Sequence, residues 1–153
     1  MSVKPIPEGF HTVTPVLAVD GGTEALSFYE RAFGAEVRLK LVMGGKLMHS
    51  ELQIGSSIVC VSDSFPEFGS VAPSGDEPVP VAMMLYTEDC DAMYARAMEA
   101  GAESLREPAD QPYGIRMSGV CDPFGYKWWI GTQIEAMTVS EMKEAAMATH
   151  GTV

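Results

Sequence analysis

The sequence carries the same apolar stripe twice, in two segments that lie 65 positions apart. In each copy the apolar residues recur with the spacing i, i+3, i+4, i+7 and i+8. The positions are Ala25, Phe28, Tyr29, Ala32 and Phe33 in the first copy, and Cys90, Met93, Tyr94, Ala97 and Met98 in the second. This spacing places five side chains on one face of an α-helix. An internal repeat of this kind predicts a fold built from two copies of one unit.

Each helical stripe lies between segments with the patterns of β-strands and turns. Gly34 is expected to end the first helix, with Asp20 or Thr23 as its N-cap, and Asp89 and Gly101 bound the second helix. The strands expected in the first unit are His11–Val19, Glu36–Met43, Leu47–Ile54 and Ser57–Ser62. Those expected in the second unit are Val81–Thr87, Glu103–Leu105, Ile115–Cys121 and Tyr126–Gly131.

These patterns predict an α+β fold made of two repeated βαβββ units. We expect a single domain at residues 10–135 that contains both repeats. Its parts are repeat 1 at 10–63, a connector at 64–79 and repeat 2 at 80–133, followed by a C-terminal helix at 138–149. Thr138 and Glu141 match a capping box, which predicts that the last helix begins at Val139.

The charge and the cysteines restrict the partners of the chain. The net charge is −11, and nucleic acids and anionic membranes instead attract proteins with a basic face. No apolar run approaches the about 20 residues that span a bilayer, and Met1–Phe10 lacks the apolar core of a secretory signal. Cys60, Cys90 and Cys121 form no CxxC pair, so neither a disulfide framework nor structural zinc is expected. We expect a cytoplasmic protein without a nucleic-acid or membrane partner.

Several motifs together resemble one known superfamily. They are Ser27-Phe28-Tyr29, Ala32-Phe33-Gly34-Ala35-Glu36, Met48-His49-Ser50-Glu51-Leu52, Asp122-Pro123-Phe124-Gly125, and Thr138 with Glu141-Met142. With the paired units they resemble the vicinal oxygen chelate superfamily, which includes glyoxalase I, extradiol dioxygenases, and fosfomycin and bleomycin resistance proteins. They are most similar to its PhnB-like branch. The resemblance implies curved mixed sheets around a shared cavity, a small-molecule ligand in that cavity, and a homodimer.

Metal-dependent members of this superfamily hold their ion with three or four His, Glu or Gln side chains. When those positions are transferred to this sequence, they fall at Thr14, near Val59, near Ala82 and at Trp129. None of these side chains is an ordinary ligand for zinc, nickel or iron. We therefore expect that this chain lacks the metal site of the superfamily and that it binds no cofactor.

His49 and Glu51 are the candidate catalytic residues. Side chains alternate along a strand, so Met48, Ser50, Leu52 and Ile54 are predicted to face the helix, and His49 and Glu51 the cavity. A histidine beside a carboxylate is suited to acid–base chemistry on a bound molecule. The pair also suits two ligands of a metal site, or a solvated polar face with no chemical role.

The candidate ligand-binding residues are Thr14, Met84, Tyr86, Arg116 and Trp129. Trp129 is predicted to face the cavity and to provide a flat apolar wall, with Trp128 packed on the helix side. Arg116 is suited to hold an anionic group of the ligand, or alternatively forms a surface salt bridge. Ordinary core packing is the alternative for both tryptophans.

Three functions are compatible with these residues. The first is a metal-free, PhnB-like protein that binds a small organic molecule, by sequestration or with acid–base chemistry through His49 and Glu51. The second is a metal-dependent enzyme, a lyase, isomerase or dioxygenase of this superfamily with non-standard ligands. The third, methyl transfer, rests only on a name used for the branch, and the sequence has no Gly-rich nucleotide loop.

Overall fold

Both apolar stripes form helices in the computed structural model, which describes residues 2–150 except the side chain of His150. The helices are α1 (Gly22–Phe33) and α2 (Cys90–Ala100). All five stripe residues of α1 are buried. In α2, Cys90 and Ala97 are buried and the other three stripe residues are half-buried. The helix caps lie 67 and 68 positions apart rather than 65, because a stripe with a 3.6-residue period also matches when it is displaced by about one turn.

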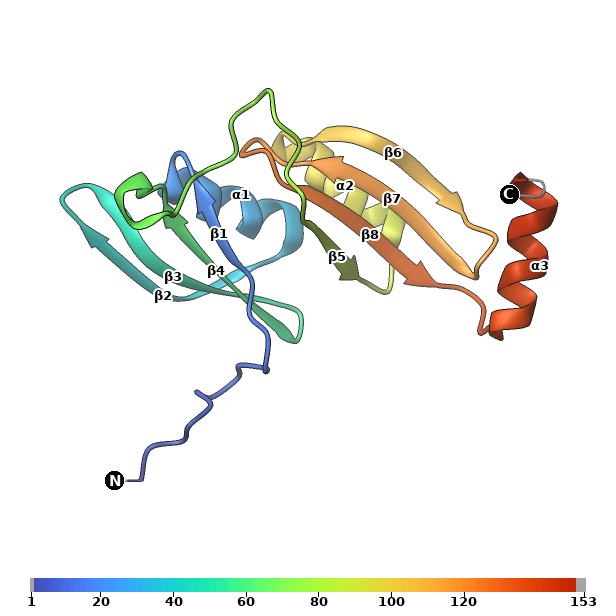
Figure 1. The fold of residues 1–153 in the computed structure, drawn as a ribbon, viewed down its shortest axis with the longest axis horizontal. Helices are drawn as coiled ribbons and strands as arrows, with labels where there is room; N and C mark the ends of the chain where they lie inside the picture. The colour runs from blue at the N-terminus through green and yellow to red at the C-terminus, as the bar shows by residue number, and fades with distance from the viewer. Residues whose placement is uncertain (1, 151–153) are drawn as a thin grey trace. The chain divides into compact units, whose positions relative to one another are not determined.

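The first unit is a four-stranded mixed sheet with α1 (Figure 1). Its strands are β1 (Val16–Val19), β2 (Glu36–Met43), β3 (Lys46–Ile54) and β4 (Ser57–Asp63). They are ordered β1-β4-β3-β2, with β1 and β4 parallel and the other pairs antiparallel. β1 is shorter than the predicted strand, because its ladder with β4 begins only after Pro15. A short 3₁₀ helix, η1 (Pro66–Phe68), follows in the connector.

The second unit repeats this topology with α2. Its strands are β5 (Ala82–Tyr86), β6 (Glu103–Asp110), β7 (Ile115–Cys121) and β8 (Lys127–Gln133), ordered β5-β8-β7-β6. β5 and β8 are parallel and the other pairs are antiparallel, as in the first unit. The prediction of two βαβββ units in an α+β fold is therefore confirmed. The helix α3 (Val139–His150) follows, and Thr138 and Glu141 form the predicted capping box.

The chain divides into two compact units, each with its own sheet. Of the described residues, the first contains those up to Pro78 together with Pro123–Gly125, and the second contains Val79–Asp122 and those from Tyr126 to His150. Within residues 2–150, no helix combines the length and the apolar character needed to cross a bilayer.

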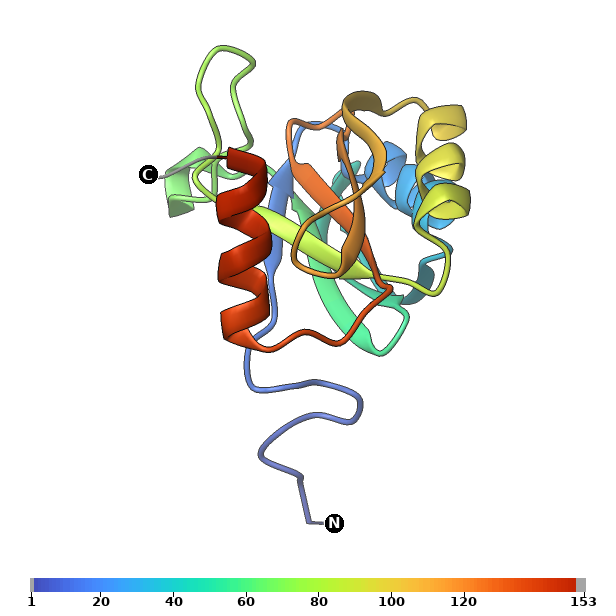
Figure 2. The ribbon, with the colours of Figure 1, turned by 90° about the vertical axis from the view of Figure 1, so that its right-hand side faces the viewer.

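In each unit the helix covers one face of its own sheet, and we call the opposite face the open face (Figures 1 and 2). The burial of alternate residues distinguishes the two faces. On β3, Leu52 is fully buried beneath α1 while Glu51 is partly exposed. On β8, Trp128 and Ile130 are buried while Trp129 is partly exposed. The open faces therefore carry the accessible side chains of both sheets.

The last strand of each unit supplies a side chain to the start of the unit's helix. In the first unit, Oδ1 of Asp63 accepts a hydrogen bond from the Gly22 N–H (2.8 Å). In the second, Oγ1 of Thr132 accepts one from the Cys90 N–H (2.9 Å). The residue before α1 is Gly21, which has no side chain to cap it, so the prediction of Asp20 or Thr23 as N-cap is wrong. Asp89 caps α2 as predicted, accepting from the Ala92 N–H (3.0 Å).

Candidate functional site

His49 and Glu51 lie together on the open face of the first unit. Nε2 of His49 is 3.7 Å from Oε1 of Glu51, and the two side chains are 45% and 19% exposed. Between them, Ser50 is fully buried on the α1 side, where its hydroxyl donates to the Val61 carbonyl (2.7 Å). The open face thus presents an imidazole beside a carboxylate, an arrangement that can accept a proton from a bound molecule.

Met48 lies differently from the prediction. Strand alternation placed it on the α1 side, but its side chain is 38% exposed and the adjacent Leu47 is fully buried. The register between β2 and β3 shifts beside Met48, which makes it the additional residue of a β-bulge. The bulge interrupts the alternation at the beginning of β3, while His49 and Glu51 keep the predicted face.

Cys60 also lies on this face of the sheet. It pairs with Glu51 across β3 and β4, so both side chains lie on the same side of the sheet. Burial, and after it the negative charge of Glu51, raise the pKa of the Cys60 thiol above its ordinary value. The neutral thiol is therefore the form that this environment favours.

The sequence placed one transferred ligand position near Val59, but the pairing of β3 with β4 shows that Cys60 is the β4 residue on the open face. Val59 pairs with Leu52 and faces α1. Counting from the turn glycine failed because the open-face residue lies five positions after Gly55 in the first unit and four positions after Gly125 in the second. Thr14 lies two residues before β1 and is half-buried, and the β1 residue that pairs with Cys60 is Val16.

Trp129, Met84 and Tyr86 lie together on the open face of the second unit. Trp129 pairs with Met84 across β5 and β8, and Tyr86 is two residues further along β5. Met84 is 40% exposed and Tyr86 64% exposed. Trp128 has the opposite orientation: its ring is buried and its Nε1 donates to Oδ2 of Asp122 (2.9 Å). The structure thus brings three of the five candidate ligand-binding residues together.

Two glycines give these side chains room to lie against the sheet. A Cβ atom at Gly119 would lie 2.3 Å from Cζ3 and 2.5 Å from Cε3 of Trp129, so the indole occupies the space above this glycine. A Cβ at Gly131 would lie 2.7 Å from Cε of Met84. Glycine within a strand often marks such a close approach. The result is an apolar surface on the open face that includes a tryptophan ring.

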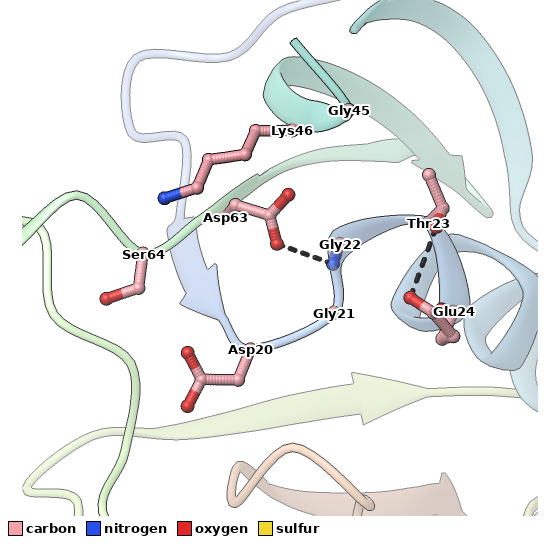
Figure 3. Close-up of a pocket in the computed structure, with 9 residues that line it drawn as sticks. All are labelled: Asp20, Gly21, Gly22, Thr23, Glu24, Gly45, Lys46, Asp63 and Ser64. Carbon is pink, nitrogen blue, oxygen red and sulfur yellow. Dashed lines mark hydrogen bonds between the residues drawn. The ribbon is translucent and has the colours of Figure 1, made fainter. Parts of the chain in front are cut away.

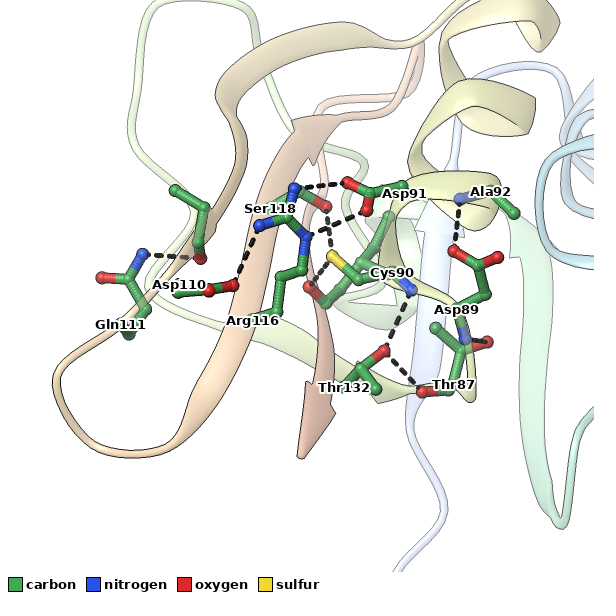
Figure 4. Close-up of polar contacts among 12 residues, drawn as sticks. Thr87, Asp89, Cys90, Asp91, Ala92, Asp110, Gln111, Arg116, Ser118 and Thr132 are labelled. Atoms are coloured by element: carbon green, nitrogen blue, oxygen red, sulfur yellow. Dashed lines mark hydrogen bonds and ion pairs between the residues drawn. The ribbon is translucent and has the colours of Figure 1, made fainter. Parts of the chain in front are cut away.

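Arg116 lies on the α2 side of the sheet rather than beside Trp129. Its guanidinium binds both carboxylate oxygens of Asp91 (2.9 and 3.0 Å) and Oδ1 of Asp110 (2.9 Å), as Figure 4 shows. Hydrogen bonds to Asp91 and then to Asp110 raise the pKa of Arg116 further above its usual range. The structure therefore contains the salt bridge that the sequence left as the alternative for this residue.

Arg106 is an open-face cation that the sequence reasoning missed. It pairs with Gly119 across β6 and β7, and Gly119 pairs in turn with Trp129. The sequence predicted only a short strand at Glu103–Leu105 followed by a loop, because proline usually interrupts a strand. The observed β6 instead extends to Asp110 and includes Pro108 at an irregular part of its register. Edge strands tolerate such a proline, and that rule was the available signal.

A cavity of about 370 Å³ lies at the beginning of α1 (Figure 3). Its lining includes Asp20, Gly22, Lys46 and Asp63. The carboxylate of Asp63 is already engaged, because Oδ1 accepts from the Gly22 N–H and Oδ2 from the Leu47 N–H (2.7 Å). We therefore interpret these contacts as structural, since they join α1, β3 and β4.

The chain is similar to proteins of known family and fold. A family model described as the Glyoxalase/Bleomycin resistance protein/Dioxygenase superfamily matches residues 10–130. The uncharacterized protein Rv0887c of Mycobacterium tuberculosis is 36% identical over 144 residues, which cover 91% of this chain and 84% of that protein. The uncharacterized protein At5g48480 of Arabidopsis thaliana is 32% identical over 132 residues, which cover 79% and 76%.

Solved structures show the same fold. The X-ray structure of the Arabidopsis At5g48480 gene product has a TM-score of 0.63 and 27% identity, covering 79% of this chain and 98% of that one. The crystal structure of TioX from Micromonospora sp. ML1 has a TM-score of 0.64 and 23% identity, covering 80% and 98%. At this level of identity, the second comparison shows the shared fold alone.

Proposed function

Because the chain belongs to the glyoxalase/bleomycin resistance protein/dioxygenase superfamily, we propose that it is a PhnB-like member that binds and sequesters a small organic molecule with a planar aromatic ring. The observation that best supports this proposal is the partly exposed Trp129 ring beside Met84 and Tyr86. Aromatic rings stack on such a surface, and methionine adapts its shape to a ligand.

The donor groups of this chain do not fit the metal site of the superfamily. The open-face pairs of the first and last strands near the transferred ligand positions are Val16 with Cys60 and Met84 with Trp129, and of these four residues only Cys60 is an ordinary ligand. Among the described residues, no three His, Cys, Asp or Glu side chains gather where they could hold a metal ion. The proposal therefore contains no step through a metal, and the predicted alternative of a metal-dependent enzyme finds no donor set here.

Trp129→Ala is expected to weaken binding of 2-naphthamide, a neutral planar probe, by about tenfold or more. The reason is the loss of stacking together with the loss of buried apolar area. Isothermal titration calorimetry measures the dissociation constant, and quenching of tryptophan emission reports contact with the ring. Phe68→Ala is the matched control, because Phe68 is an exposed aromatic residue of η1 that belongs to neither sheet. Equal affinity of Trp129→Ala and the wild type, or no binding to the wild type, would refute the proposal.

Two glycine variants test whether binding depends on where the Trp129 ring lies, in addition to whether the ring is present. Gly119→Ala keeps the indole but introduces a methyl group where the ring lies, so affinity for 2-naphthamide is expected to fall. Gly75→Ala is its control, because a Cβ atom at this connector glycine would meet nothing within 4 Å. An unchanged affinity in Gly119→Ala would contradict the stacking geometry.

A second candidate function is acid–base chemistry by His49 and Glu51, which the 3.7 Å approach of their side chains favours. Nε2 of His49 would take a proton from an acidic C–H group, and solvent would return a deuteron to the carbon in D₂O. The protein is then expected to accelerate deuterium exchange of hydroxyacetone, as followed by NMR. His49→Gln should lower the exchange rate at least about tenfold, since general bases contribute factors of this size or more.

The control for this experiment lies on the same strand. Gln53 follows Glu51 on the open face and donates to the Gly55 carbonyl (2.8 Å), so Gln53→Ala should leave the exchange rate unchanged. Exchange at the buffer rate in the wild type, or equal effects of His49→Gln and Gln53→Ala, would rule out the catalytic role.

A further inference from the structure

Arg106, Gly119 and Trp129 form one row across three neighbouring strands of the second unit. The strand register pairs Arg106 with Gly119 and Gly119 with Trp129, and residues that pair directly across strands share a face. Neighbouring strands are about 4.8 Å apart, so the backbone of Arg106 lies about 5 Å from that of Gly119. The indole of Trp129 lies over this glycine. An arginine side chain spans this distance. A molecule stacked on the ring would therefore be within reach of the guanidinium once the Arg106 side chain turns from Gln111 toward the ring.

The two arginines of this sheet differ in their partners. Arg116, on the α2 side, is paired with the carboxylates of Asp91 and Asp110. The guanidinium of Arg106 donates to the neutral side-chain oxygen of Gln111 (3.3 Å). Within residues 2–150, no described carboxylate oxygen lies within 4.0 Å of the Arg106 guanidinium, as an ion pair would require. Its positive charge is thus available to a ligand on the open face.

We propose that the open face of the second unit is selective for planar aromatic molecules that carry an anionic group. The ring stacks on Trp129, and Arg106 holds the carboxylate, sulfonate or phosphate. This inference rests on the proposed function, because it requires the ring to bind at Trp129. The inference adds that the ligand is anionic, because the planar guanidinium fork is suited to bind carboxylate, sulfonate or phosphate groups. It also transfers to Arg106 the anion-binding role that the sequence suggested for Arg116.

The test compares two probes of nearly the same shape, 2-naphthoate and its neutral analogue 2-naphthamide, by calorimetry at low salt. The wild type is expected to bind the carboxylate about tenfold more tightly than the amide, which is the size expected for one charge-assisted hydrogen-bonded contact. Arg106→Gln should reduce this ratio to about one by weakening the binding of the carboxylate. The preference should also weaken as salt is added.

Two further variants make the outcomes distinguishable. Lys143→Gln, on α3, changes the net charge by the same amount and should keep the wild-type ratio. Trp129→Ala should weaken both probes. A wild-type ratio retained in Arg106→Gln, or a wild type that prefers the amide, would overturn the charge selectivity while the binding proposal stands. If Trp129→Ala binds both probes as the wild type does, the proposed function itself fails.

Discussion

Asp122→Ala is expected to lower the free energy of unfolding by about 3–5 kcal/mol, because two buried hydrogen bonds to a carboxylate are lost. Asp122 is only 4% exposed. Its Oδ1 accepts from the Tyr126 N–H (2.9 Å) and its Oδ2 from Nε1 of Trp128 (2.9 Å). Alanine would leave both donors without this partner between β7 and β8, where water has little access.

Urea denaturation followed by tryptophan fluorescence and by near-UV circular dichroism measures this loss. Asp122→Asn should have an intermediate effect, because the amide keeps one oxygen acceptor but turns an N–H group toward the other donor. Asp76→Ala, at an exposed connector position, should change the stability by less than about 0.5 kcal/mol. A stability of Asp122→Ala within about 1 kcal/mol of the wild type would contradict the importance of this carboxylate.

Asp63→Ala is expected to cost about 2–4 kcal/mol, since its carboxylate accepts hydrogen bonds from two backbone N–H groups. One belongs to Gly22 at the beginning of α1 (2.8 Å) and the other to Leu47 on β3 (2.7 Å). The helix depends on this acceptor because Gly21, at its N-cap, has no side chain. The loss should appear in urea denaturation and as faster hydrogen exchange of the Gly22 and Leu47 amides.

Asp20→Ala is the matched control for Asp63→Ala. Asp20 is one of the two residues, with Thr23, that the sequence suggested as the N-cap of α1, and it lines the same cavity in Figure 3. Its side chain is exposed, so its replacement should change the stability by less than about 0.5 kcal/mol. Equal losses in the two variants would show that the cap was assigned to the wrong carboxylate.

Features that depend on neighbours in sequence were predictable. Asp89 caps α2, Gly34 ends α1, and the capping box places the beginning of α3. Strand alternation likewise placed His49 and Glu51 on the face away from α1, because a regular strand changes face at every residue. In each case the decisive contacts lie within a few residues of one another.

Features that depend on distant residues or on irregular backbone were not predictable. The cap of α1 comes from Asp63, 41 residues beyond the N–H that it binds. A β-bulge exposes Met48, and the register between β3 and β4 places Cys60 rather than Val59 on the open face. The sequence did not indicate Arg106 as a strand residue, because β6 continues through Pro108, where a loop was predicted. Tertiary pairing decides each of these, and no local pattern encodes it.

Other predictions from the sequence stay predictions. They are the homodimer, the cytoplasmic location, and the roles of Thr14 and Arg116 in ligand binding. For Arg116, the pairing with Asp91 and Asp110 means that an anionic ligand would have to compete with two carboxylates. Arg106 carries its charge on the open face and has no carboxylate partner among the described residues, so it is a better first target for mutation than Arg116.

The contact between the final strand and the helix start has a consequence for the order of events on the ribosome. The Gly22 N–H emerges 41 residues before the carboxylate that binds it, and the Cys90 N–H emerges 42 residues before Thr132. The first turn of α1 has no side-chain acceptor until translation has delivered Asp63, and that of α2 has only its local cap, Asp89, until Thr132 follows. Contacts far apart in sequence must therefore form together. In each βαβββ unit, a fragment truncated before its last strand would therefore lack the acceptor that this strand supplies to the helix.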